Sequence, residues 1–245
     1  MQTESLAIVI AVFLAAGVVK GVSGMGLPTL SMALLSLFMP PAAAAALMVV
    51  PSLATNLAQC LGPHWRWLAR RLWPMWIGLV LLTVFSPLPG IDAPGGHAGA
   101  ILGGVLAAYG AWGLLRPTLP DLRNHALAAG GLAGSLTGLL TAATGVFVIP
   151  LVPFLQTLRL GKEQFIQALG LSFTVATAAL AARLGYANAG DWTANLSGCA
   201  VATLAAFAGL GIGSALRRRM DPALFQRTLY GAFLLLGLVM AARSA

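Results

Sequence analysis

Charged side chains are scarce in this sequence, and acidic ones are the scarcest. Asp, Glu, Lys and Arg together make up 8% of the 245 residues, and only six residues are acidic. A soluble globular domain usually carries about 25% charged residues. The shortage excludes a soluble domain of any size, and the 59% share of hydrophobic residues predicts a chain that lies mostly within a lipid bilayer.

Acidic residues and histidines are also missing from the middle of the apolar runs. Proton relays in membrane pumps usually need a buried carboxylate or histidine, so the sequence offers no group that suits a coupling proton at mid-membrane. It also contains no Gly-rich, Lys-containing nucleotide-binding motif. Facilitated or potential-driven movement of an anion therefore fits better than a pump. The groups at predicted helix ends or in loops are Glu4, Asp92, Asp121, Glu163, Asp191, Asp221, His64, His97 and His125.

Cysteine is rare as well, and it indicates no metal site. Cys60 and Cys199 stand in apolar stretches without metal-type spacing, so we interpret both as small core-filling residues and expect no metal and no cofactor. The first residues, Met1 to Glu4, lack the basic region of a cleavable signal peptide, so the first apolar segment is expected to remain. The formal charge of +8 is scattered over helix ends, which indicates topology signals and not a nucleic-acid partner.

What the sequence does contain is a pair of long apolar segments, 6–38 and 126–158, each interrupted by glycine and proline. Each would measure about 50 Å as one helix, whereas the hydrocarbon core of a bilayer is about 30 Å thick. Paired, interrupted segments at corresponding places in two halves point to the substrate site of a transporter. The interruptions are Gly17, Gly21, Gly24, Gly26 and Pro28, then Gly130, Gly131, Gly134, Gly138, Gly145 and Pro150.

Six further apolar helices are predicted, over residues 42–62, 68–86, 97–115, 163–184, 192–214 and 222–243. Lys and Arg favour cytoplasmic loops, and this preference tests two ways of placing the interrupted segments. If each segment crosses once, with a cytoplasmic N-terminus, then Arg159, Lys162 and Arg217–Arg219 fall outside the cell. If each segment enters, turns and returns to the same side, with the N-terminus outside, the basic loops fall inside and only Arg183 and Arg243 do not.

The second placement predicts the fold class, an all-α polytopic membrane protein with two inverted repeats. Each repeat, over residues 1–120 and 121–245, would be a broken, re-entrant hairpin that enters as a half-helix, followed by three transmembrane helices. An odd number of crossings per repeat places the second repeat upside down relative to the first, as in secondary transporters. Direct self-similarity is weak, with Gly17, Gly21, Gly26 and Thr55 matching Gly134, Gly138, Gly145 and Thr174.

The turn that interrupts the first segment is the main candidate site. Non-helical backbone within a bilayer must face protein or a water-filled cavity. A helix that starts near Leu27, with Pro28 in its first turn, would point free N–H groups and its positive end into that space. Two such turns facing each other would form one cavity for a small anion, unless the glycines only let helices pack closely. The first turn offers Gly21, Ser23, Gly24, Met25 and Gly26, and the second Thr141, Thr144 and Gly145.

Lys20 is the only basic residue deep in an apolar run of the first half. A charge there costs at least about 2.5 kcal/mol on insertion scales and usually marks a site. Lys20 would attract an anion into the cavity, or else only balance the C-terminal dipole of the helix that it ends. Thr137 stands at the matching place in the second half, so the cavity would be asymmetric.

Polar residues recur on the helix that follows each interrupted segment. Thr55 and Gln59 share a face, because residues four apart are neighbours on a helix. These side chains would line the cavity, or else form hydrogen bonds between helices. They are Ser52, Thr55, Asn56 and Gln59 in the first half, and Gln167, Ser172, Thr174 and Thr177 in the second.

Two blocks of sequence resemble the sulfite exporter TauE/SafE family, of the 4-toluene sulfonate uptake permease type. They are Gly21–Pro28 with Pro41, Ala45 and Pro51–Asn56, and Thr141–Phe147 with Gly170–Thr174. The resemblance implies a multi-pass transporter, not an enzyme, that moves sulfite, sulfonates or related organosulfur anions across the bacterial inner membrane. Many members carry a longer glycine run where this chain has Gly26-Leu27-Pro28, which leaves the anion itself open. A negative potential inside the cell makes export the natural direction.

Two alternatives have other functions. Gly21-Val22-Ser23-Gly24 also matches the short Gly-x-Ser-Gly pattern of rhomboid-type intramembrane serine proteases, in which a histidine from another helix, here His97, activates the serine. That serine stands in the first segment instead of the fourth, and the second half repeats the layout without a Ser/His pair. A non-transporting membrane scaffold is the other alternative. The sequence does not indicate the oligomeric state.

Overall fold

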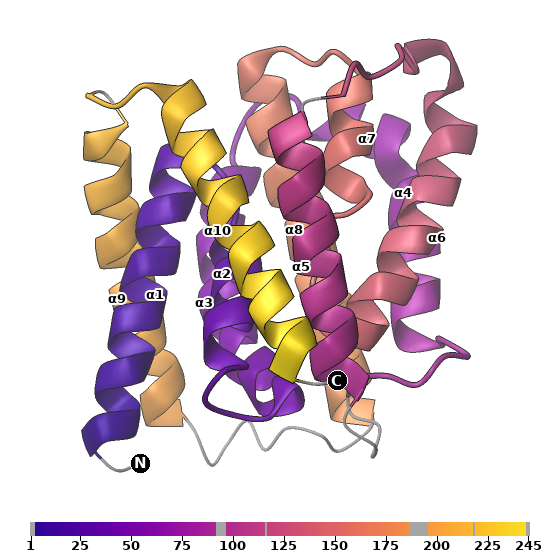
Figure 1. The fold of residues 1–245 in the computed structure, drawn as a ribbon. Helices are drawn as coiled ribbons and strands as arrows, with labels where there is room; N and C mark the ends of the chain where they lie inside the picture. Colours follow the sequence, from indigo (N-terminus) through magenta and orange to yellow (C-terminus); the bar gives the residue numbers. More distant parts are fainter. Residues whose placement is uncertain (1–2, 92–96, 116, 187–195, 218, 244–245) are drawn as a thin grey trace.

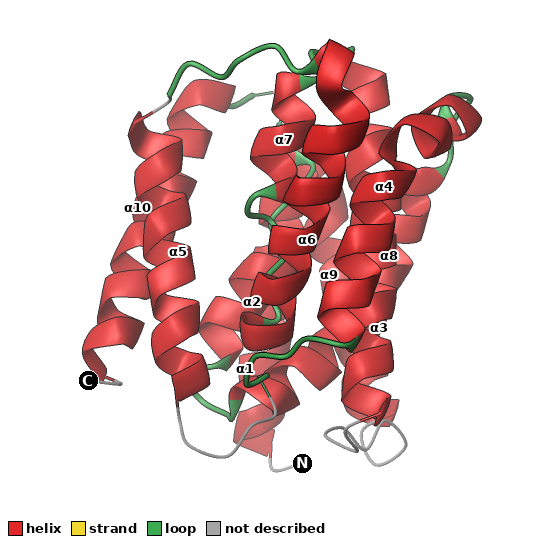
Figure 2. Ribbon diagram, turned by 90° about the vertical axis from the view of Figure 1, so that its right-hand side faces the viewer, coloured by secondary structure: helices red, strands yellow, loops and turns green. Residues whose placement is uncertain are grey.

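The computed structural model describes residues 3–91, 97–115, 117–186, 196–217 and 219–243. Throughout these ranges the chain forms helices and connections, without a β-strand. The elements are α1 (Thr3–Ser23), α2 (Leu27–Leu35), α3 (Pro41–Cys60), α4 (Trp65–Val84), α5 (His97–Leu115), η1 (Arg123–His125), α6 (Ala126–Thr144), α7 (Leu151–Thr157), α8 (Lys162–Tyr186), α9 (Leu196–Leu216) and α10 (Pro222–Arg243). They form a bundle of long helices with both termini at one end (Figures 1 and 2).

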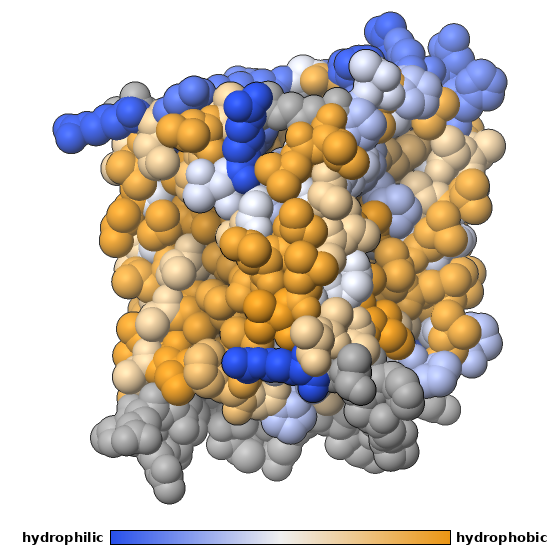
Figure 3. Space-filling view, viewed as in Figure 1, coloured by the Kyte–Doolittle hydropathy of each residue, from blue (hydrophilic) through white to orange (hydrophobic). Residues whose placement is uncertain are grey.

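Most of these helices are built to cross a bilayer. Within the described ranges, α1, α3, α5, α6, α8, α9 and α10 are long and apolar enough to span one. Helix α4 is not among them, because its first turns carry Arg66, Arg70 and Arg71. A space-filling view shows a wide apolar belt with hydrophilic side chains gathered along one edge (Figure 3). The chain is therefore a multi-pass, all-helical membrane protein, as the composition predicts.

The predicted helices agree with the observed ones to within a few residues. The predictions over 42–62, 68–86, 97–115, 163–184 and 222–243 correspond to α3, α4, α5, α8 and α10. Helix α4 begins three residues earlier than predicted and α8 continues to Tyr186. The predicted start of the 192–214 helix lies outside the described residues, where α9 is described from Leu196 onward.

The two interrupted segments are broken where the sequence predicts, but their arms are unequal. The first segment divides into α1, with 21 residues, and α2, with nine; the second divides into α6, with 19, and α7, with seven. Helices of 21 and 19 residues are about 30 Å long. The expectation that each segment enters as a half-helix is therefore wrong, because unbroken helix-forming sequence precedes the glycine turn by a full membrane thickness. Only the returning arms are short.

Contacts between helices define the direction of the short arms. Lys20 contacts Asn56, and Gln59 bonds to Gly24, so α1 and α3 run in the same direction with their C-terminal ends together. The chain must come back between them through α2. In the second half, α6 and α8 both run parallel to α4, so α7 likewise brings the chain back.

Four helix pairs carry most of the packing, and small residues form their contacts. Helices α1 and α9 are parallel, with Gly17 against the backbone of Ala206; α4 and α6 are also parallel, with Gly134 against the backbone of Met75. A side chain at either glycine would collide with that backbone, as expected for close helix packing in membranes. The pairs α3 with α8 and α5 with α10 are antiparallel.

These directions collect most of the basic residues at one end of the bundle. Helices α3, α5 and α9 finish there, and α4, α6, α8 and α10 begin there. We call it the basic end; its described basic residues are Arg66, Arg70, Arg71, Arg123, Arg159, Lys162, Arg217, Arg219 and Arg227. The opposite end holds both termini, Arg183 and Arg243. Arg116 and Arg218 lie outside the described residues.

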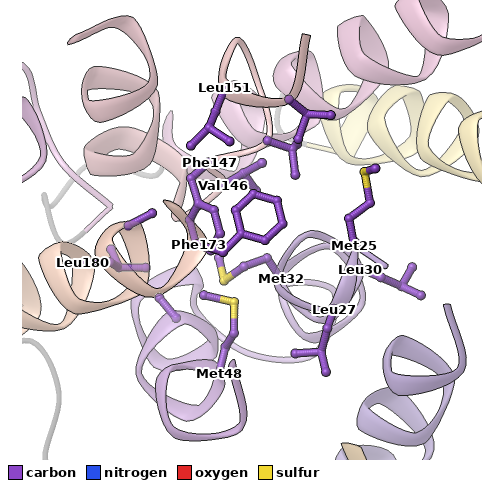
Figure 4. Packing of buried hydrophobic residues seen from close by; sticks show 14 of the residues in the cluster. Met25, Leu27, Leu30, Met32, Met48, Val146, Phe147, Leu151, Phe173 and Leu180 are labelled. Carbon is purple, nitrogen blue, oxygen red and sulfur yellow. The ribbon is translucent and has the colours of Figure 1, made fainter. Parts of the chain in front are cut away.

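The two short helices lie inside the bundle. Eight of the nine residues of α2 are buried, and so are most residues of α7. Their apolar side chains join one cluster, in which Met32 and Met48 pack against Phe147 and Phe173 (Figure 4). The turn at the start of each short helix is consequently held deep in the protein.

Candidate functional site

The turn between α1 and α2 is stabilised largely by its own backbone. Gly24 and Gly26 have φ of 81° and 101°, a region that favours glycine. The N–H of Gly24 donates to the carbonyl of Lys20 at 2.7 Å. The Ser23 hydroxyl lies 2.8 Å from the Val19 carbonyl and 2.7 Å from that of Met25, and it accepts the N–H of Met25 at 3.2 Å.

The start of α2 is left without a side-chain cap. Gly26 occupies the N-cap position, and no side chain bonds to the exposed N–H groups. The first intrahelical bond runs from the N–H of Leu30 to the carbonyl of Gly26. The N–H groups before it have no helical partner, and the positive end of the helix dipole lies there. With Pro28 in its first turn, the helix start is as the sequence predicts.

Lys20 lies one turn before this break and is almost completely buried. Its side chain is 1% exposed, and its ammonium donates to Thr55 Oγ1 at 3.1 Å and to Asn56 Oδ1. Both partners are neutral groups on α3. Within the described part of the chain, the one ion pair joins Arg123 to Asp121, so no acid balances Lys20. A buried cation with neutral partners is a strong electrostatic attractor for an anion.

Further polar groups near this cation lack partners. Helix α3 presents Ser52, Thr55, Asn56 and Gln59 within two turns, and Gln59 Nε2 donates to the carbonyl of Gly24 at 2.8 Å. Among the described residues, Ser52 Oγ and Gln59 Oε1 are buried without a hydrogen-bond partner, as is Thr29 Oγ1 on α2. Buried polar atoms without partners are expensive in an apolar interior. A polar ligand bound here would form hydrogen bonds with these atoms.

The turn between α6 and α7 reproduces the backbone of the first. Gly145 has φ of 71°, and its N–H donates to the carbonyl of Thr141 at 2.8 Å. The Thr144 hydroxyl bonds to the Leu140 carbonyl and accepts the N–H of Val146, as Ser23 does in the first turn. The cap geometry therefore makes Thr141 the counterpart of Lys20. The predicted match of Lys20 with Thr137 is wrong by one helical turn.

In the part of the chain that the structure describes, no cation contacts the second turn. Thr141 is fully buried, and its hydroxyl donates to the carbonyl of Thr137 in its own helix at 2.7 Å. The surroundings of the turn are apolar, since a Cβ on Gly145 would lie 3.1 Å from Met32 Cε and 3.2 Å from Ile91 Cδ1. Met32, Val146 and Phe147 pack here in the view of Figure 4. The single cavity shared by both turns stays a prediction.

Several of the predicted site residues join helices to one another. Gly21 packs against the backbone of Leu210 and Ser214 in α9. Ser172 accepts the indole N–H of Trp76 at 3.0 Å, and Thr174 lies 3.3 Å from the sulfur of Cys60. For these three residues the packing and interhelical alternatives fit the contacts.

Two residues that the sequence did not single out reach the first turn. Thr29 lies in the first turn of α2, and Tyr109 on α5 is buried with its hydroxyl 3.7 Å from the sulfur of Met25. The only feature of the sequence that could have indicated either residue is a hydroxyl side chain within an apolar run. Nothing in the sequence alone shows which of many such hydroxyls faces the break.

A cavity lies at the basic end, where α3 ends and α8 begins. Its volume is about 230 Å³, and its lining includes Gln59, His64, Glu163 and Gln167. Gln59 also donates to the carbonyl of Gly24, so this side chain contacts both the cavity and the turn that follows Lys20.

A comparison with known protein families shows which family this chain belongs to. The model of the family described as Sulfite exporter TauE/SafE matches residues 9–240, nearly the whole chain. The chain belongs to the sulfite exporter TauE/SafE family. Neither the curated proteins nor the solved structures give a match.

TauE/SafE proteins are transporters, not enzymes. Family membership therefore confirms the predicted class of membrane transporter, and it gives no support to the protease alternative. Within the TauE/SafE chain, the Ser23 hydroxyl is held by backbone groups of its own turn. The side chain of His97, the partner which that alternative requires, lies outside what is described.

Proposed function

We propose that this TauE/SafE protein carries a small oxoanion, such as sulfite, a sulfonate or a related organosulfur anion, out of the bacterial cytoplasm. The anion would bind beside Lys20, at the break between α1 and α2. The observation that carries the proposal is the buried Lys20 ammonium, whose partners Thr55 and Asn56 are both neutral. An isolated buried charge is strongly unfavourable, and an anion of opposite charge would offset that penalty.

The proposed site has donors for the oxygens of such an anion. The uncapped N-terminus of α2 supplies backbone N–H groups, a common way to hold sulfate-like and phosphate-like groups. The unpartnered hydroxyls of Ser52 and Thr29 are further donors. Gln59, which lines the 230 Å³ cavity and bonds to the carbonyl of Gly24, would move aside to admit the anion.

The proposed mechanism uses two inverted repeats, residues 1–120 and 121–245. Three features support this arrangement. The parallel pair α1 with α9 has its counterpart in the parallel pair α6 with α4, and α3 with α8 and α5 with α10 are antiparallel, as a two-fold axis in the membrane plane requires. The two glycine turns share one pattern of hydrogen bonds. Rocking of one repeat against the other would give alternating access.

The proposed direction follows from charge. The basic end would face the cytoplasm, because Lys and Arg are retained on that side of the membrane. A cytoplasm-negative potential then drives an anion outward, at about 2.3 kcal/mol per charge for each 100 mV. The mouth near Gln59 would be the cytoplasmic entrance.

The test is anion efflux from proteoliposomes loaded separately with sulfite, methanesulfonate, thiosulfate and sulfate, under an inside-negative potential. Lys20→Gln should reduce efflux at least about tenfold, because a charged buried hydrogen-bond group is removed. Lys162→Gln makes the same chemical change at an exposed position and should leave efflux unchanged. Lys20→Arg, which keeps the charge, separates loss of the cation from loss of folding.

The outcomes are distinct. Retention of all four anions by the wild-type protein would end the transport proposal. Efflux that is equal in wild-type and Lys20→Gln protein would leave transport intact and remove Lys20 from the substrate site.

A further inference from the structure

A second basic site lies far from the glycine turns, where α4 and α6 meet at the basic end. It is a cavity of about 530 Å³ that both helices form. Helix α6 lies alongside α4 in Figure 1, and the two are in close parallel contact. Its wall includes the polar and aromatic side chains of Trp67, Arg70, Arg71, Arg123, Asn124 and His125, and the start of α6 completes it with apolar residues.

Two of the three arginines in this cavity have no acid to balance them. Arg123 is paired with Asp121 at 2.7 Å, and its hydrogen bonds lower the pKa of Asp121 to about 2, so this pair is neutral at physiological pH. Arg71 donates to the backbone carbonyl of Arg123 at 2.6 Å, and its Nε is buried without a described partner. Arg70 bonds to no described residue. A net charge of about +2 is left for a ligand.

Tryptophan places this cavity at the membrane–water boundary. The Arg71 guanidinium lies over the ring of Trp67, 5.4 Å from its centre, and Arg66 lies over Trp65 at 5.2 Å. Both indoles are about half exposed. Tryptophan concentrates at the level of the lipid headgroups, so the arginines of this cavity lie at the depth of lipid phosphates.

A separate apolar groove lies further along α4, on the face of the helix that carries Arg70. Arg70, Trp73, Ile77 and Leu81 are spaced three and four residues apart and therefore share one face of the helix. That face lines a second cavity of about 310 Å³, whose wall is made by Trp73, Trp76, Ile77, Val80 and Leu81. Trp73, Ile77 and Leu81 are each about half exposed. The groove has the apolar character and the direction of an acyl chain.

From this arrangement we propose that α4 and α6 bind one anionic phospholipid of the phosphatidylglycerol type. Its phosphate lies against Arg70 and Arg71, and an acyl chain follows Trp73, Ile77 and Leu81 toward the membrane interior. Basic pockets between transmembrane helices are known to take anionic headgroups, and guanidinium groups hold phosphate through paired hydrogen bonds. A zwitterionic lipid carries the same phosphate without net charge and binds more weakly here.

Native mass spectrometry of the full chain tests the site. The protein is delipidated in detergent and mixed with equal amounts of phosphatidylglycerol and phosphatidylcholine. The wild-type protein should retain the anionic lipid preferentially. The double variant Arg70→Gln/Arg71→Gln should lower that preference by about thirtyfold, since each of the two basic groups near a membrane surface contributes about 1 kcal/mol.

Two further variants keep the test decisive. Arg227→Gln removes an exposed charge from the same end of the bundle and should leave the preference unchanged. Trp73→Ala should shorten lipid retention while the headgroup preference stays, because it removes groove wall and no charge. Equal retention of both lipids by the wild type, or an unchanged preference in the double arginine variant, would overturn the proposal. A sample to which inorganic phosphate binds as well as the lipid would show a phosphate site without a lipid groove.

Discussion

The two glycine turns have the same backbone and opposite chemistry. In both, a glycine with positive φ follows a long helix, and its N–H donates to the carbonyl four residues earlier. The residue just before the glycine has a hydroxyl, which accepts the N–H of the residue just after the glycine. The carbonyl that accepts the glycine N–H belongs to Lys20 in the first turn and to Thr141 in the second. One turn therefore holds a buried cation, and the other is enclosed by Met32, Ile91 and other apolar groups.

This difference shows that the residues that form the turn are not the residues that would bind the ligand. The turn itself needs glycine and a short hydroxyl side chain, and both halves have these. The attraction for an anion comes from one side chain, a helical turn before the glycine, and from the polar face of α3 opposite it. The two turns therefore share a backbone but differ in polarity, and variants of each turn can test this difference.

The largest expected effect comes from removing the polar group of each turn in parallel. Lys20→Gln should reduce anion efflux at least about tenfold, whereas Thr141→Val should change it less than about twofold, because the Thr141 hydroxyl bonds only within its own helix. Efflux from proteoliposomes is the measurement. Equal losses in the two variants would show that both turns contribute to the substrate site.

The next largest effect is expected from the charge of the substrate. One buried cation balances one negative charge, and a second charge would remain unpaired in an apolar interior. Methanesulfonate should therefore leave the vesicles about tenfold faster than sulfate, which is similar in shape but doubly charged. The rates are compared in matched vesicles at one pH. If sulfate moves as fast as methanesulfonate, further cationic groups must contact the anion.

Stability should respond almost equally in the two turns. Gly24→Ala and Gly145→Ala each force a side chain into positive φ, which costs about 1–2 kcal/mol. The second variant should be slightly worse, because its Cβ meets Met32 and Ile91, while a Cβ on Gly24 meets nothing within 4 Å. Thermal unfolding in detergent measures both. A large loss in only one variant would contradict the equivalence of the turns.

The smallest effects are expected from the hydroxyls. Ser23→Ala and Thr144→Ala each remove the acceptor of one N–H and should destabilise the protein by about 0.5–1.5 kcal/mol. Most of the efflux should survive in both. Complete loss of efflux in Ser23→Ala alone, with normal stability, would give Ser23 a direct contact with the anion.

Some members of the candidate site could be predicted from the sequence, and others could not. Lys20, Thr55, Asn56 and Gln59 were expected near the first break, and these residues do meet there. Their spacing on helices is local, and a lone lysine in an apolar run is conspicuous. Ser172 and Thr174 follow the same pattern, yet their hydroxyls contact Trp76 and Cys60 on neighbouring helices. Helical periodicity predicts which residues share a face of a helix, but it does not predict which neighbouring helix packs against that face.

The lengths of the helices on either side of each break could not be predicted from the sequence either. The breaks at Gly24–Gly26 and at Gly145 follow from glycine and proline, but the full-length α1 and α6 before them were not expected. The match of Lys20 with Thr137 failed because glycines recur every few residues in both segments. Only the cap geometry, with its positive φ and its N–H bond, identifies Thr141 as the counterpart.

The sequence by itself determined that this chain lies in a membrane, where its helices break, and that one lysine is buried among apolar residues. These properties depend on composition and local backbone preference, which neighbouring residues decide. The tertiary structure alone decided that Lys20 meets Thr55 and Asn56, that the second turn is apolar, and that two arginines of α4 share a cavity with α6. Such contacts join residues far apart in the chain, and they form only when close packing at small residues has chosen the partner of each helix.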